Sequence, residues 1–299
     1  MTLGSAPFLT PAGRVRIGWR LGGFFGLALL VGTAVGTAAP PGVLGGAVSL
    51  LVGALVSGSL LLALDGRGPC ALGFYISQDS VTESARGMAL GLLIGMTVVG
   101  GMALFGGMSW VSQPGTVGDW FVGAAGALAW FAIPAAAEEA LLRGYPLQAL
   151  TEAYGPVVGV GITSVAFGAM HVANPGSGVL EVANVTAAGL LFGVVYVKTL
   201  SLWWVTAIHL GWNWAHGYLA DVSVSGLDVV DAPLYEGMGV GADWLSGGAF
   251  GPEGSVVTTV VLLVATGWVW RSKRWKPSQA ALASGSLLTT ESELNEEKD

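Results

Sequence analysis

The fold of this protein is decided by the stretch Pro134-Ala-Ala-Ala-Glu138-Glu139-Ala-Leu-Leu-Arg143-Gly-Tyr-Pro146. It ends an apolar run that begins near Trp120 and is long enough to cross a membrane. An acidic side chain at the centre of a membrane helix costs about 2.5 to 3.5 kcal/mol on insertion scales. Such a side chain normally faces a protein interior or a water-filled cavity. The adjacent carboxylates are therefore the first candidates for a functional site.

The composition around that stretch indicates a polytopic membrane protein. Hydrophobic residues make up 53% of the 299 residues, and charged residues only 10%. Soluble domains carry roughly 25% charged residues, so this chain needs lipid around it. Eight apolar segments are predicted to span the membrane: roughly 19–39, 42–64, 87–108, 120–143, 156–173, 179–197, 201–220 and 255–271. The predicted fold class is an all-α membrane protein, a polytopic bundle of about eight transmembrane helices.

Orientation follows from the positive charges. All twelve Lys and Arg residues fall on one side of such a bundle, whereas the opposite loops, about 109–118, 174–178 and 221–254, contain none. Because cytoplasmic loops carry an excess of Lys and Arg, both termini are predicted to be cytoplasmic. The predicted location is the cell (plasma) membrane, with a multi-pass topology.

Two parts of the chain are expected. Residues 1–275 form a polytopic membrane domain with its catalytic core at about 120–220, and residues 276–299 form an acidic, disordered C-terminal tail. The loop 221–254 is Gly-rich and acidic. Its carboxylates include Asp221, Asp228, Asp231, Glu236 and Asp243. They could bind a cation, but an exposed loop is the more ordinary interpretation.

Three further polar residues lie within predicted spans. His171 follows an apolar run in the fifth span, and His209 and Asn213 are four residues apart in the seventh, on one helix face. A lone membrane histidine is usually a hydrogen-bonding packing residue. Two histidines, an asparagine and a pair of glutamates on three segments instead favour a shared cavity.

Local spacing separates the two glutamates. Glu139 and Arg143 are four residues apart, in the favourable order for an ion pair within a helix. Glu138 points about 100° away around the helix and does not share that pairing. Glu138 is thus the better candidate for a general base, and Glu139 with Arg143 is predicted to be structural. The alternative, that both glutamates simply hold Arg143, stays open.

The order of these residues resembles that of a known family. Three motifs carry the resemblance: Glu138-Glu139-Ala-Leu-Leu-Arg143-Gly144, Phe167-Gly-Ala-Met-His171 and His209-Leu-Gly-Trp-Asn213. They are similar to those of the CPBP intramembrane proteases, named for CAAX proteases and bacteriocin-processing enzymes, which include the type II CAAX prenyl protease. The resemblance covers roughly Trp120 to Leu219.

The resemblance implies an intramembrane endopeptidase acting on a membrane-associated substrate, either CAAX-type or bacteriocin-related. Glu138, helped by His171, would activate water, and His209 and Asn213 would stabilise the oxyanion, with Phe167 in a supporting position. Family members have also been described as metalloproteases. Glu138, His171 and His209 would then be the three ligands of a catalytic zinc ion. The cofactor is none or zinc; the metal-free mechanism is slightly favoured, because Asn is a poor zinc ligand.

Other classes of function remain open. A membrane transporter or ion-coupled carrier would also use buried Glu and His, but it would be expected to carry inverted repeats, and no convincing repeat is found. A non-catalytic immunity or scaffold protein of the same fold is disfavoured by the intact motifs. The predicted partners are a peptide or prenylated-protein substrate and the lipid bilayer, with no nucleic acid.

If every predicted span is a straight helix, the candidate site residues lie at different depths in the membrane. Glu138 and His209 would lie roughly 10 Å below the cytoplasmic face, whereas His171 would lie about 22 Å deep if its span begins at Pro156. The difference disappears if the fifth span begins below the membrane surface, or if Leu147–Tyr154 is part of a longer helix. A cavity that opens to the cytoplasm is predicted.

Overall fold

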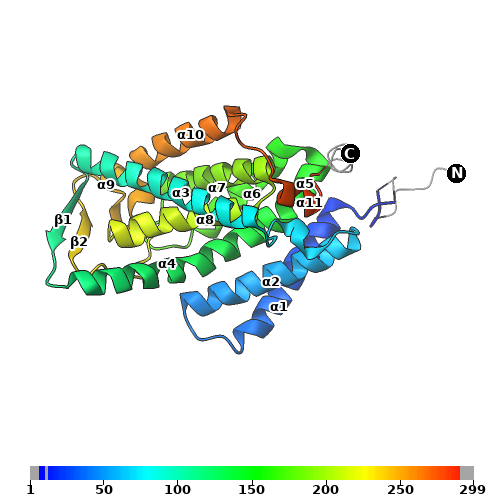
Figure 1. Ribbon diagram of the computed structural model, residues 1–299, viewed down its shortest axis with the longest axis horizontal. Coiled ribbons are helices and arrows are strands. Elements are labelled where there is room, and N and C mark those ends of the chain that lie inside the picture. The colour runs from blue at the N-terminus through cyan, green and yellow to red at the C-terminus, as the bar shows by residue number, and fades with distance from the viewer. Residues whose placement is uncertain (1–6, 11–12, 290–299) are drawn as a thin grey trace.

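The computed structural model, which describes residues 7–10 and 13–289, is a bundle of long helices (Figure 1). Its helices are α1 (Ile17–Gly36), α2 (Val43–Leu64), α3 (Gln78–Leu104), α4 (Val117–Glu139), α5 (Tyr145–Tyr154), α6 (Pro156–Met170), α7 (Val179–Thr199), α8 (Leu202–Trp214), α9 (Asp243–Ser246), α10 (Val256–Arg271) and α11 (Gln279–Ala283). Short 3₁₀ turns lie at Pro69–Leu72, Gly248–Phe250 and Pro252–Gly254. The predicted all-α, polytopic membrane class is confirmed.

The helices differ in how readily they would cross a bilayer. Among the described residues, five helices are long and apolar enough by length and composition: α1, α2, α3, the continuous helix Val117–Tyr154 and α7. Two shorter apolar helices are α6 and α10. The π-helical turn Ala215–Leu219 continues α8, so this segment is also longer than its α-helical part. A total of eight spans stays a prediction.

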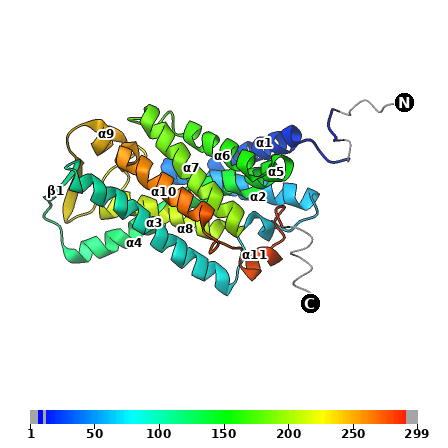
Figure 2. The same ribbon diagram turned by 90° about the horizontal axis from the view of Figure 1, so that it is seen from above.

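A small sheet marks one end of the bundle. Strand β1 (Met108–Ser112) pairs antiparallel with β2 (Tyr235–Gly239), with Met108 opposite Gly239 and Ser112 opposite Tyr235. Figures 1 and 2 show this sheet and α9 at the end opposite α5 and α11. We call it the sheet end. Part of loop 221–254 is therefore folded, and its residues near Pro252 are buried, in contrast to the exposed loop expected from sequence.

Helix α3 begins nine residues before the span that hydropathy predicts from residue 87. Ser77 starts the helix with a reciprocal capping box to Ser80. The first turns are polar, so a hydropathy window misses them. Farther along, α3 packs closely on α8: a Cβ added at Gly91 would lie 2.1 Å from the carbonyl oxygen of Ile208. Glycine is what permits this approach of two helix backbones.

Helices α4 and α5 form one continuous rod. The π-helical turn Ala140–Gly144 joins them without a break, and Gly155, at φ 83°, then reverses the chain into α6. A positive φ of this size favours glycine. Leu147–Tyr154 therefore belongs to a longer helix, which is one of the two conditions under which the predicted depths agree.

The start of the predicted C-terminal tail is packed rather than free. Ser278 caps α11, and the hydroxyl of Ser286 donates to the buried amide oxygen of Gln148 on α5 at 2.8 Å. Residues 276–289 thus lie against the bundle, and residues 290–299 of that predicted tail lie outside the described residues.

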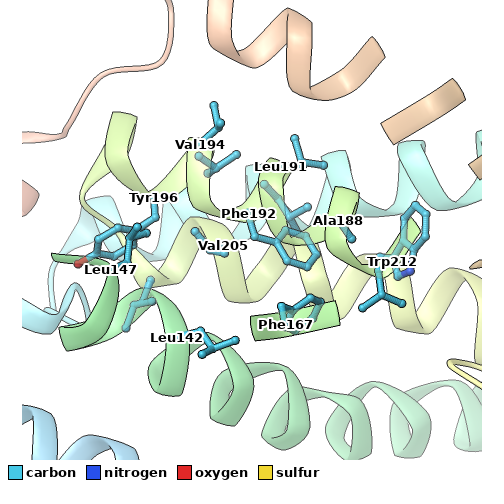
Figure 3. Packing of buried hydrophobic residues seen from close by; sticks show 14 of the residues in the cluster. Leu142, Leu147, Phe167, Ala188, Leu191, Phe192, Val194, Tyr196, Val205 and Trp212 are labelled. Atoms are coloured by element: carbon cyan, nitrogen blue, oxygen red, sulfur yellow. The ribbon is translucent and has the colours of Figure 1, made fainter. Parts of the chain in front are cut away.

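The main apolar core surrounds α7 and α8 (Figure 3). Phe167 of α6 and Phe192 of α7 point toward one another in this view, with ring centroids 6.0 Å apart. Trp212 of α8 is buried in the same cluster. The three motif-bearing segments therefore meet on one rigid apolar framework.

Candidate active site

Glu139 and Arg143 form a buried ion pair. Arg143 Nη1 lies 3.1 Å from Glu139 Oε2, and both side chains are fully buried. A second guanidinium nitrogen donates to the carbonyl of Gly189 at 3.1 Å, and the guanidinium carbon lies 4.4 Å from the ring centroid of Phe167. Glu139 and Arg143 therefore form the ion pair that their spacing predicts, and the ring of Phe167 makes a cation–π contact with Arg143.

His209 lies between the two glutamates. Its Nδ1 is 2.9 Å from Glu139 Oε1, and its Nε2 is 3.9 Å from Glu138 Oε2. Because a carboxylate only accepts, Nδ1 donates to Glu139, so a neutral His209 presents an unprotonated Nε2 toward Glu138. The ring stacks on Phe192 with centroids 5.0 Å apart. Glu139 therefore fixes both Arg143 and His209, a second contact that helical spacing could not predict.

His171 ends α6 with a defined tautomer. Its Nδ1 lies 2.8 Å from the carbonyl oxygen of Phe167, one turn earlier. A carbonyl oxygen only accepts, so Nδ1 carries the proton and a neutral ring keeps Nε2 as an acceptor. The imidazole also lies 4.9 Å from the Phe167 ring. Phe167 thus orients His171 through its backbone and its side chain.

One pocket brings the four predicted catalytic residues together. It has a volume of about 190 Å³ and is lined by Glu138, His171, His209 and Asn213. Apolar side chains complete the wall, among them Trp130, Phe131, Pro134, Val224, Leu227 and Val229. Glu138 is the more accessible glutamate, with 23% of its side chain exposed, against 0% for Glu139. The structure therefore separates the two carboxylates as the helical spacing predicts.

Glu138 and His171 lie at the same depth because each is the same number of residues away from the turn between α5 and α6. Glu138 precedes Tyr154 by 16 residues, and His171 follows Gly155 by 16. Both lie about 24 Å along their helices from the turn that joins α5 to α6. The far wall of the pocket comes from residues 224–229, in a loop of the sheet end that contains no Lys or Arg. This lining does not support the predicted opening on the side that carries the positive charges.

The zinc alternative does not fit this geometry. Within residues 7–10 and 13–289, no three His, Cys, Asp or Glu side chains are grouped to hold a metal ion. Glu138 Oε2 and His209 Nε2 approach to 3.9 Å, and the bond from His209 Nδ1 to Glu139 is compatible with a metal on Nε2, so two of the three proposed ligands lie close together. Glu138, His171 and His209 line one pocket, but they are not grouped closely enough to hold one zinc ion.

Several site residues were missed from the sequence. Ser225 lines the pocket, and Asn174 lines it beside His171. Glu253, which is 7% exposed, lies behind Ser225. Nothing in their spacing marks them, since they come from loops. A carboxylate just before the last apolar segment was the one available signal.

Comparison with known proteins supports the resemblance. Residues 120–215 match the family model described as type II CAAX prenyl endopeptidase Rce1-like, a range that contains all three motifs. Neither the search of curated proteins nor that of solved structures found a match. The family is one of membrane proteases of the CAAX type. Residues 120–215, which carry the three motifs in order on one helical framework, are therefore similar to the type II CAAX prenyl endopeptidase Rce1-like family.

Proposed function

We propose that this protein is an intramembrane endopeptidase in which Glu138 is the general base. The proposal is based on the different environments of the two glutamates. Glu139 is fully buried and held by Arg143 and His209, whereas Glu138 lines the pocket and is partly accessible. A carboxylate in contact with a pocket can take a proton from a bound water, and one locked in an ion pair cannot.

The proposed reaction uses the remaining pocket residues in separate roles. Glu138 accepts one proton from water, and Nε2 of His171 accepts a hydrogen bond from the O–H that remains, while the water oxygen adds to the scissile carbonyl carbon. The Asn213 amide donates to the oxyanion; His209 adds a second donor only when both its ring nitrogens carry protons. The C–N bond then breaks as Glu138 returns its proton to the leaving amine. Loss of one oxyanion donor typically costs on the order of 100- to 1000-fold in rate.

The substrate we propose is a membrane-associated peptide, either a prenylated CAAX-type C-terminus or a bacteriocin-related peptide. The apolar lining from Trp130, Phe131 and Leu227 supports a peptide with apolar side chains near the scissile bond. The protein is proposed to lie in the cell membrane with eight spans and both termini cytoplasmic. The one-sided distribution of all twelve Lys and Arg residues supports this orientation.

The test is cleavage of a peptide library by the purified protein in lipid vesicles, with prenylated and unprenylated versions of each peptide. Wild type is compared with Glu138→Gln, a change that preserves side-chain shape and removes the base. We expect Glu138→Gln to lose at least about 100-fold in kcat. Full activity in Glu138→Gln would refute the assignment of the base. Loss of activity with a chelator, together with stoichiometric zinc in the active protein, would refute the metal-free mechanism.

A further inference from the structure

Glu253 is a buried carboxylate that the three motifs do not include. It lies in the 3₁₀ turn Pro252–Gly254, just before α10, and is 7% exposed. Within the described part of the chain, no Lys, Arg or His side chain forms an ion pair with it. Burying a carboxylate without a cation is unfavourable unless hydrogen bonds compensate. The hydrogen bonds of Glu253 must therefore compensate for the burial of its carboxylate.

Those bonds join three separate segments. Trp212 Nε1 of α8 donates to Glu253 Oε1 at 2.7 Å, and the Ser225 hydroxyl donates to Glu253 Oε2 at 2.5 Å. The backbone carbonyl of Glu253 accepts from Asn184 Nδ2 of α7 at 2.7 Å. We call Trp212, Ser225 and Glu253 the clasp. It ties a loop residue to the helix that carries His209 and Asn213.

The loop residue in the clasp has an unfavourable backbone conformation. Ser225 has φ 49°, in the left-handed region that side chains other than Gly and Asn rarely adopt. Its carbonyl accepts from Asn174 Nδ2 at 2.9 Å, just beyond His171 in the chain. Non-glycine residues in this conformation persist only where surrounding contacts hold them, and they cluster at functional sites. Ser225 is held at its hydroxyl by Glu253 and at its carbonyl by Asn174.

The clasp lies on the wall of the candidate active site. Ser225 and its neighbours Val224, Leu227 and Val229 line the pocket that contains Glu138. Ser225 and Glu253 also line a second cavity of about 20 Å³, together with His171 and His209. A cavity of this size has room for about one water. The clasp therefore lines one cavity with both imidazoles, and through Ser225 it borders the apolar surface that a peptide would contact.

We propose that Glu253 is a positioning residue that holds residues 224–229, through Ser225, as the substrate-facing wall of the pocket. The inference rests on the proposed peptidase function and extends it to the loop between α8 and α10. A peptide with apolar side chains would pack against Val224, Leu227 and Val229. The side-chain hydrogen bonds that the described residues give Glu253 and Ser225 join them to Trp212 and to each other rather than to Glu138, His171, His209 or Asn213. The clasp thus governs how the peptide is bound more than how fast it is cleaved.

The variants isolate one hydrogen bond. Ser225→Ala removes the hydroxyl and leaves the backbone preference for positive φ almost unchanged. The matched control is Ser223→Ala in the same loop, where the hydroxyl donates at 2.5 Å to exposed Asp228, and Ser223 does not line the Glu138 pocket. Glu253→Gln is the conservative partner, because its amide oxygen can still accept from Trp212 and its amide nitrogen can donate to Ser225. Glu253→Ala removes all side-chain contacts of the clasp.

Two measurements are made on the full chain in vesicles. The first is steady-state cleavage of a peptide that wild type hydrolyses. We expect Ser225→Ala and Glu253→Ala to raise KM about tenfold with kcat within about twofold, and Glu253→Gln to stay near wild type. The second is amide hydrogen exchange of residues 222–230, which needs no cleavage. We expect about tenfold faster exchange in Ser225→Ala and unchanged exchange in Ser223→Ala.

The outcomes separate this inference from the function it rests on. If wild type cleaves no peptide, the proposed function fails, and the exchange of residues 222–230 alone decides whether the clasp holds the loop. If Ser225→Ala exchanges like wild type, the clasp does not position the loop. If exchange rises but KM stays unchanged, the loop is not the substrate-facing wall. If kcat falls with KM unchanged, Glu253 acts on the reacting groups, and the positioning role is also refuted.

Discussion

Replacing Glu139 by glutamine should destabilise the protein far more than the same change at Glu138. Arg143 is fully buried, and its partners are Glu139 at 3.1 Å, the Gly189 carbonyl at 3.1 Å and the Phe167 ring. Removing one partner of a buried ion pair typically costs about 3 to 5 kcal/mol, because the remaining charge stays buried. The substituted glutamine would keep one acceptor oxygen, so we expect the lower end, about 3 kcal/mol.

Glu138 offers a contrast one residue away. Its side chain is 23% exposed, and its ion-pair contact, to His209, is 3.9 Å long. Exposed or weak pairs contribute about 0 to 1 kcal/mol, so Glu138→Gln should change stability by less than that. In a domain of 150 to 250 residues, 1 kcal/mol shifts Tm by roughly 2 to 4 °C. We therefore expect Tm to fall by about 6 to 12 °C in Glu139→Gln and by less than about 4 °C in Glu138→Gln.

The assay is thermal unfolding of the purified protein in detergent, followed by the fluorescence of its 12 tryptophans. The double variant Glu139→Gln with Arg143→Met is the control, because it removes the orphaned cation. It should recover part of the lost stability, since replacing a whole buried pair by apolar groups is often neutral. Equal Tm losses at Glu138 and Glu139, or no recovery in the double variant, would refute the division between accessible base and buried scaffold.

Three further predictions concern other parts of the bundle. Gly91→Ala should lower stability by about 2 kcal/mol or more, because its Cβ would lie 2.1 Å from a backbone oxygen of α8. Gly100→Ala, on the same helix but with open space around the added Cβ, should not lower stability. Unfolding in urea or detergent measures the stability of both variants. Burial, assisted by the charges of neighbouring carboxylates, raises the pKa of Asp221 to about 6. Because this lies above the value of about 3.9 for an unfolded Asp, its effect is to lower stability as pH rises from about 4 to 6. Asp221→Asn should flatten that part of the Tm–pH curve, and an unchanged slope would contradict the assignment. Cys70, the one cysteine, is exposed and lies in the predicted cytoplasmic loop after α2. It should react with a membrane-impermeant thiol reagent only after cells are permeabilised. Labelling of intact cells would contradict the predicted orientation.

Features set by local chemistry were predictable from the sequence. The spacing of Glu139 and Arg143 predicted their ion pair, because residues four apart on a helix face the same side. The same helical geometry predicted that Glu138 points elsewhere, and it lines the pocket. Hydropathy predicted the helices, although it missed the polar start of α3 before residue 87. In each case the deciding interaction lies within one or two turns of one segment.

Loops and turns were poorly predicted for a physical reason. The clasp residues Ser225 and Glu253 are separated by 28 positions and are joined only once α8 and α10 have packed. Composition predicts a disordered tail from residue 276, yet the hydroxyl of Ser286 donates to the buried amide oxygen of Gln148 on α5. A polar residue in a loop has the same sequence signature whether it faces water or a buried partner.

The sequence by itself determined that this chain is a helical membrane protein with paired glutamates, two histidines and an asparagine in the order typical of the family that it resembles. Composition and helical period suffice for that, because lipid requires helices to satisfy their own backbone and penalises every charge. Only the tertiary structure decided that His209 lies between Glu138 and Glu139. It also decided that a distant loop closes the pocket. Both features depend on contacts between helices and loops that are distant in the sequence. The helical periodicity of a single segment does not predict such contacts.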